Sequence, residues 1–211
     1  MIVSRKKRFL FFHIPKTGGH TITHRLAKFL EVRSNKIEDI VRILHYHKGG
    51  NLHSKVSSQD NWLFMEKHRD FFSFAYVRNP WDRIFSYYLS GRRNGKTVDL
   101  ISIEDFSKFF DEVKDGTHRY SGRIKQSQVD QLISPIGEIG VKYVARFEDF
   151  ENEFDSIIEK LNIDKSDINY DVIDNKSNHK GLKYQDLYIQ KNIDWIAKVH
   201  REDIDFFGYT Y

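Results

Sequence analysis

An unbroken apolar run followed by a glycine turn is the feature of this chain that most limits how it can fold. The run RFLFFHI, residues 8–14, has the length of a strand and lacks polar alternation, as is typical of a central strand buried on both faces. The turn PKTGG follows, and the next apolar side chains recur at helical spacing: Ile22, Leu26, Phe29 and Leu30. A strand, a tight turn and a helix in this order predict the opening of an α/β sheet.

The alternation of strand and helix continues along the chain. FFSFAYV, residues 71–77, predicts a second buried strand, after which Asn79 and Pro80 suit the cap and the first turn of a helix. VKYVA, residues 141–145, predicts a third strand with an amphipathic helix after it. This order predicts an α/β fold in which a mostly parallel central sheet is covered by helices on both faces, giving three layers.

Other segments have a less definite pattern. Residues 34–44 have helical apolar spacing, and the polar residues 45–60 are interpreted as a loop that leads into a helix. The C-terminal stretch from residue 184 predicts a helix that ends near residue 203.

The composition indicates one folded domain over residues 1–211. The aromatic share of 15% is higher than a disordered chain carries, and with only three prolines no proline-rich linker divides the chain. The net charge of +4 favours acidic ligands without indicating a nucleic acid partner. Cysteine is absent, which excludes disulfides, thiolate metal sites and a cysteine nucleophile and suits a reducing compartment.

No stretch has the character of a membrane span or a targeting signal. The apolar runs are far shorter than the ~18–20 residues that a span needs. The stretch SRKKRFLFF has too short an apolar part for a secretory signal and no small-residue cleavage site after it, so its basic residues are interpreted as a tail before the first strand. We therefore expect no stable membrane insertion, and a cytoplasmic protein of bacterial origin.

The PKTGG turn has the chemistry of an anion site. Such a turn after a buried strand gathers several backbone N–H groups, and the next helix adds its positive end. Lys16 adds a full charge, Thr17 and Thr21 add hydroxyl donors, and Gly18 and Gly19 permit close approach and unusual φ values. A Walker A loop differs, because its lysine follows the glycines. The alternative is a plain strand-to-helix turn with a surface lysine.

A second candidate anion motif follows the second strand. In VRNPWDRIFSYY, Arg78 stands at the strand end and Ser86 lies about two helical turns further on. A guanidinium offers a planar fork of donors that suits phosphate or sulfate, and Arg83 is a further candidate. The alternative is an arginine that holds a carboxylate, with Ser86 merely packed. Because ligands bind at the carboxyl ends of parallel strands, we expect the two motifs to form one site.

The stretches FFHIPKTGGHT and FAYVRNPWDRIFSYY together resemble the sulfotransferase superfamily, and most closely its carbohydrate branch, which includes the heparan sulfate 2-O type and bacterial relatives. Later parts of the chain, VKYVARFEDFENEFDSIIEKLNI and REDIDFFGYTY, resemble the same branch in the same order. The resemblance implies a P-loop-NTPase-like fold that binds the sulfuryl donor 3′-phosphoadenosine 5′-phosphosulfate (PAPS) without a metal.

The resemblance also assigns roles to residues. It implies that Arg78 and Ser86 hold the 3′-phosphate of PAPS. The residues that it places around the 5′-phosphosulfate are Lys16, Thr17, Gly18, Gly19, His20 and Thr21. His20 departs from the pattern, because family members mostly have GGTS or AGTS where this chain has GGHT, so the usual hydroxyl has moved to Thr21.

Sulfuryl transfer to a hydroxyl needs a base for the acceptor proton and positive charge near the departing phosphate oxygen. Lys16 fits the second role, and a histidine fits the first because its pKa is near neutrality. The resemblance places a catalytic histidine ahead of the arginine strand, where His53 matches best and His47 and His45 are alternatives. His45 and His47 form a His-x-His pair, but no third ligand has suitable spacing, so no metal site is predicted.

These features predict a PAPS-dependent sulfotransferase that acts on a hydroxyl of a carbohydrate or glycoconjugate. Two other classes stay open. A P-loop-like kinase of a nucleotide or sugar would depend on ATP and Mg²⁺, and a non-catalytic module would bind nucleotides or sulfated glycans without turnover. The sequence leaves the acceptor and the oligomeric state open.

Overall fold

The computed structural model describes residues 1–30, 55–92, 101–172 and 182–211. These belong to two compact units, one made of Met1–Val77 with Asp130–Asn175 and the other of Arg78–Val129 with Lys176–Tyr211. The helix predicted at residues 34–44 and the first part of the predicted loop lie outside the described residues.

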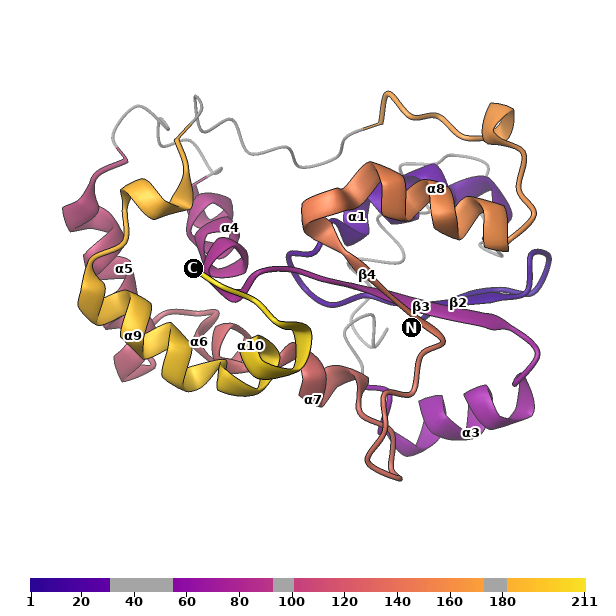
Figure 1. Cartoon of the computed structure of the whole chain (residues 1–211), viewed down its shortest axis with the longest axis horizontal. Helices are drawn as coiled ribbons and strands as arrows, with labels where there is room; N and C mark the ends of the chain where they lie inside the picture. The colour runs from indigo at the N-terminus through magenta and orange to yellow at the C-terminus, as the bar shows by residue number, and fades with distance from the viewer. Residues whose placement is uncertain (31–54, 93–100, 173–181) are drawn as a thin grey trace. The chain divides into compact units, whose positions relative to one another are not determined.

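The first unit is built on a four-stranded sheet in the order β1-β2-β3-β4 (Figure 1). Its strands are β1 (Ile2–Ser4), β2 (Phe9–Phe12), β3 (Phe72–Val77) and β4 (Tyr143–Arg146). β2, β3 and β4 are parallel to one another, as predicted, whereas β1 is antiparallel to β2. The α/β class and the mostly parallel sheet are thus confirmed.

β1 is the strand that the sequence does not predict. Ile2 pairs with Phe11 and is buried, and the basic residues 5–8 form the turn between β1 and β2. Three residues are too few to show the run or alternation that identifies a strand. The predicted basic tail is therefore wrong: it is a strand and a turn, and only the pairing with β2 reveals this.

Helices flank the sheet of the first unit. Figure 1 shows α1 (Gly19–Arg25) and α8 (Phe150–Lys160) over one face and α3 (Gln59–Lys67) on the other side. Under α1 and α8 the strands present aromatic rings, with the centroids of Phe11 and Phe74 5.0 Å apart. The apolar side chains predicted for the first helix, the last of which is Leu30, are buried in this core.

Short turns of 3-10 helix complete the first unit: η1 (Ala27–Phe29), η3 (Phe147–Asp149) and η4 (Lys165–Asp167).

The described part of the second unit is helical. Its helices are α4 (Pro80–Arg92), α5 (Ile103–Asp115), α6 (Ser121–Lys125), η5 (Tyr184–Asp186), α9 (Gln190–Val199) and α10 (Arg201–Phe207), and α7 (Gln128–Leu132) begins in it. Asn79 caps α4 as predicted, since its Oδ1 accepts the N–H of Trp81 at 3.1 Å. This cap fixes where the chain turns after Arg78.

The C-terminal helix is interrupted, contrary to the prediction of one helix ending near residue 203. α9 ends at Val199, and α10 begins at Arg201 and continues to Phe207. His200 between them has φ −109° and ψ 25°, and it is fully buried. Both segments have helical patterning, so the bend at His200 has no signal in the sequence.

Candidate active site

The predicted anion turn begins where β2 ends. After Phe12, residues 13–18 form the turn that leads into α1. Lys16 has φ 72° and Gly18 has φ 82°, both in the left-handed region. Glycine adopts this region freely, whereas a residue with a side chain is strained there by about 1–3 kcal/mol, and such residues are enriched at functional sites. Arg8 and Asn162 also have positive φ, so the conformation of Lys16 agrees with a functional role but does not by itself assign one.

Packing requires both glycines of the turn. A Cβ on Gly19 would lie 2.0 Å from Cδ2 of His13, and one on Gly18 would lie 2.6 Å from Cε2 of Phe150. These distances are far below van der Waals contact, so a larger residue would displace the buried ring of His13 or the partly buried ring of Phe150. The unusual φ predicted for the two glycines is confirmed at Gly18 and wrong at Gly19, which is already the first residue of α1. The close approach seen here is to the protein's own rings, and the approach to a ligand stays a prediction.

The polar side chains of the turn differ in exposure. Thr17 is fully buried, and its Oγ1 donates to the carbonyl oxygen of Ile14 at 2.9 Å. Thr21 is also buried, whereas His20 is half-buried with its ring edge-on to that of His13, 6.2 Å between centroids. The hydroxyl of Thr17 thus stabilises the turn itself. Contacts of Thr17, His20 and Thr21 with the donor stay predictions.

The second motif lies in the second unit. Arg78 is the residue after β3, and its Nε donates to Oδ2 of Asp82 at 2.7 Å. Ser86 is buried one helical turn beyond Asp82 on α4. The ion pair is the alternative role considered for Arg78. It is compatible with anion binding, because a guanidinium has about five N–H donors and this pair uses the one at Nε.

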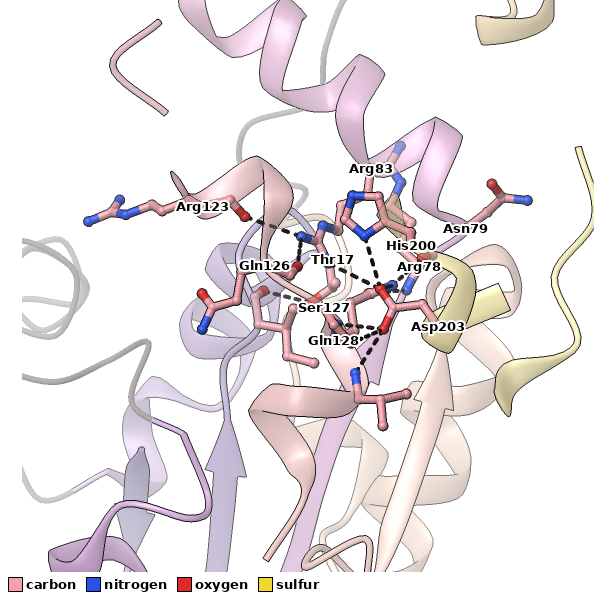
Figure 2. Close-up of polar contacts among 12 residues, drawn as sticks. Thr17, Arg78, Asn79, Arg83, Arg123, Gln126, Ser127, Gln128, His200 and Asp203 are labelled. Carbon is pink, nitrogen blue, oxygen red and sulfur yellow. Dashed lines mark hydrogen bonds and ion pairs between the residues drawn. The ribbon is translucent and has the colours of Figure 1, made fainter. Parts of the chain in front are cut away.

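The backbone of Arg78 is held by a buried glutamine. The N–H of Arg78 donates to Oε1 of Gln128 at 2.9 Å, and Nε2 of Gln128 donates to the carbonyl oxygen of Arg78 at 2.8 Å. Gln128 in turn contacts Asp203 of α10, as Figure 2 shows. Both Gln128 and Asp203 are fully buried.

Arg83, the further anion candidate considered from the sequence, is part of the same interior and contacts buried groups of the protein. Its side chain is 1% exposed, its Nη2 donates to the carbonyl oxygen of Gln126 at 2.8 Å, and its Nη1 lies 4.0 Å from Oδ2 of Asp203 (Figure 2). Nδ1 of His200 lies 3.4 Å from the same oxygen. Burial favours neutral Asp203, but the close contact with His200 and the charge of Arg83 act against it, and the pKa of Asp203 stays below its ordinary value.

A model of the sulfotransferase family matches residues 1–210. The chain belongs to the sulfotransferase family. The match includes both compact units and both predicted anion motifs, and it shows that this protein is a sulfotransferase enzyme. No curated protein and no solved structure matches the chain.

The predicted general base of this sulfotransferase lies outside the described residues. His53 and its alternatives His47 and His45 all fall within residues 31–54. Their assignment stays a prediction based on the resemblance and on the chemistry of histidine.

Two further observations concern the described ranges of this sulfotransferase. Within them, no three His, Asp or Glu side chains lie together in a way that could hold a metal ion. No helix in the same ranges is both long enough and apolar enough to cross a bilayer.

Sequence reasoning missed Gln128 and Asp203. A buried amide has no sequence signature, because its partners, such as Arg78, are distant in the chain. Asp203 had a weak signal, since it stands in the stretch REDIDFFGYTY that resembles the C-terminal ending of the family. Its role as a buried acceptor is visible only in the structure.

Proposed function

We propose that this sulfotransferase transfers a sulfuryl group from PAPS to a hydroxyl group of a carbohydrate or glycoconjugate. The observation that carries the proposal is the turn after β2, where Lys16 keeps a left-handed backbone conformation in a chain of the sulfotransferase family. A left-handed backbone at a lysine costs about 1–3 kcal/mol, and strained residues of this kind cluster at active sites.

The turn would bind the 5′-phosphosulfate. The ammonium group of Lys16 would stabilise the negative charge that develops on the phosphate oxygen as the sulfur–oxygen bond breaks. The backbone N–H groups of the turn would donate to oxygens of the phosphosulfate. His20 and Thr21 are the polar residues that follow in α1.

Arg78 and Ser86 would bind the 3′-phosphate. β2 and β3 are parallel, and the Lys16 turn and Arg78 follow their carboxyl ends in sequence. Ligands of such sheets bind at this edge. A guanidinium suits a phosphate because its donors match two oxygens at once. Asp82 would orient this guanidinium through its bond to Nε.

A histidine would remove the acceptor proton, with His53 first and His47 and His45 as alternatives. The acceptor oxygen forms a bond to sulfur as sulfur's bond to the phosphate oxygen breaks, the proton passes to the histidine, and the products are a sulfate ester and 3′-phosphoadenosine 5′-phosphate (PAP). A positioned base of this kind is worth ~10²–10⁴ in rate. No metal is assigned a role in this proposal.

Ligand-dependent thermal stability tests the donor. PAP at about 100 times its Kd should add about 2.7 kcal/mol to the free energy of unfolding. We expect PAP to stabilise wild type, and Lys16→Ala and Arg78→Ala to reduce the effect. A preference for ATP with Mg²⁺ would instead indicate the kinase, and indifference of both variants to PAP would contradict the assigned site.

Turnover tests the base and the acceptor. Sulfate transfer from PAPS would be measured over a panel of glycans with His53→Ala, His47→Ala and His45→Ala beside wild type. We expect one variant, His53→Ala, to lose ~10²–10⁴ in kcat while PAP binding is unchanged. PAP binding without turnover on any acceptor would indicate the non-catalytic module.

A further inference from the structure

We propose that Gln128 and Asp203 are positioning residues for the anion site of Arg78. They fix the backbone of Arg78 and thereby the direction from which its guanidinium reaches the 3′-phosphate. This inference rests on the proposed function, because it concerns the phosphate site assigned to Arg78.

Gln128 contacts both peptide groups of Arg78. The N–H that bonds to Oε1 at 2.9 Å belongs to the peptide before the Cα of Arg78. The carbonyl that accepts from Nε2 at 2.8 Å belongs to the peptide after it. Fixing both peptide planes fixes the Cα–Cβ direction of Arg78, in the way that a neighbouring strand would. Gln128 thus acts on Arg78 at the residue where the chain leaves β3.

Asp203 holds Gln128 in place. Its Oδ1 accepts the backbone N–H of Gln128 at 2.7 Å and that of Val129 at 2.9 Å, together with the hydroxyl of Ser127 at 2.7 Å. Its Oδ2 lies 3.4 Å from Nε2 of Gln128. A carboxylate accepts hydrogen bonds and repels another acceptor, so it selects the amide orientation in which Oε1 faces the N–H of Arg78.

Asp203 is fully buried, although burying a carboxylate is costly. An exposed Ser or Asp could cap the short α7 just as well. Burial together with His200 and Arg83 makes Asp203 a rigid acceptor (Figure 2). Arg78 is then held at its backbone by Gln128 and at its Nε by Asp82. Such preorganisation supports precise recognition of a phosphate.

The experiment compares two nucleotides on the full chain. PAP carries a 3′-phosphate and adenosine 5′-monophosphate (AMP) does not, so the ratio of their Kd values by calorimetry reports 3′-phosphate recognition. Loss of folded protein lowers the apparent binding of both and leaves the ratio unchanged. We expect Gln128→Met to lower the preference for PAP over AMP about tenfold, with AMP binding unchanged. A tenfold change lies within the range of coupling energies measured between residues in contact. In an Arg78→Ala background, Gln128→Met should have no further effect.

Asn192→Leu is the matched control. Asn192 is a fully buried amide in the same unit, and its Oδ1 accepts from Nζ of Lys114 at 2.7 Å. This variant should keep the wild-type preference for PAP. If Gln128→Met does not fold, Asp203→Asn provides the same test. The asparagine keeps an oxygen that can accept the backbone N–H groups of Gln128 and Val129, but it lacks the charge that orients the amide of Gln128.

The outcomes separate this inference from the proposed function. If Arg78→Ala lowers the preference for PAP and neither Gln128→Met nor Asp203→Asn does, the positioning role is overturned and the phosphate site stands. If wild type has no preference for PAP, or Arg78→Ala keeps it, the assigned phosphate site fails and the positioning role fails with it.

Discussion

The imidazole of His13 lies against the backbone of Gly19 so closely that a Cβ at residue 19 would stand 2.0 Å from its Cδ2. His13 is itself buried and stacked on Phe11, with 5.8 Å between ring centroids. The ring therefore has little room to move. The glycine at residue 19 is thus required by packing against His13.

Gly19→Ala should destabilise the protein by about 1–3 kcal/mol, because overpacking forces a buried ring or the backbone to shift. Urea unfolding measures this cost. Gly122→Ala is the matched control, since Gly122 lies in α6 with open space where a Cβ would stand, and the substitution should be neutral or slightly stabilising. The cost should be smaller when His13 is also changed to Ala. Equal effects of Gly19→Ala in both backgrounds would contradict the His13 contact as its cause.

Arg25 should matter far more to stability than its ion-pair partner. Its side chain is 1% exposed, and it donates to both oxygens of Glu151, to the carbonyl of Tyr170 at 2.9 Å and to that of Val172 at 3.2 Å. Arg25→Met leaves these carbonyls without that donor and should cost about 2–3 kcal/mol.

Glu151→Gln is the comparison for Arg25. The side chain of Glu151 is 57% exposed, so water replaces much of what the pair provides, and the cost should be about 0–1 kcal/mol. Chemical denaturation of both variants measures the difference. Equal losses would mean that the ion pair, and not the buried guanidinium, stabilises the unit.

Asn79 makes two separable contributions. Its Oδ1 caps α4 through the N–H of Trp81, and its Nδ2 donates to the carbonyl oxygen of Thr210 at 2.8 Å. Asn79→Ala should cost about 2 kcal/mol, the sum of about 1 for the cap and about 1 for the second bond. Asn79→Ser keeps a cap oxygen without placing a second acceptor against the carbonyl of Thr210, and it should cost about half as much in the same unfolding measurement. A cost for Ser as large as for Ala would show that the bond to Thr210 dominates.

His200 should make stability depend on pH. Burial, the largest cause, lowers the pKa of His200 below its ordinary value of 6.5, although Asp203 acts in the opposite direction. The unfolded chain then binds a proton at a higher pH than the folded protein does. The contribution of His200 is therefore fully present above pH 6.5 and is lost as the pH falls toward the folded pKa.

A neutral variant isolates this effect. Wild type should lose stability between pH 7.5 and 5.5, by no more than about 1.4 kcal/mol for each pH unit below 6.5, and His200→Gln should be spared this loss. Urea unfolding at both pH values gives the four free energies. If the gap between wild type and variant is the same at both values, the pKa of His200 is not lowered by folding.

The sequence by itself determined β2, β3 and β4, the cap at Asn79 and the family. Each of these depends on residues close together in the chain. A strand buried on both faces is a nearly continuous apolar run, such as FLFF, or FSFAYV with one serine in it, and a helix cap is set by its own neighbours. The glycine turn was identified as a candidate anion site for the same reason.

Only the tertiary structure decided how these pieces are held. β1 is too short to predict and exists because it pairs with β2, and the bend at His200 accompanies burial of its ring. Gln128 is separated from Arg78 by 50 residues and from Asp203 by 75. A hydrogen bond between such distant residues has no periodicity to leave in the sequence, so a buried polar contact appears only when the chain has folded around it.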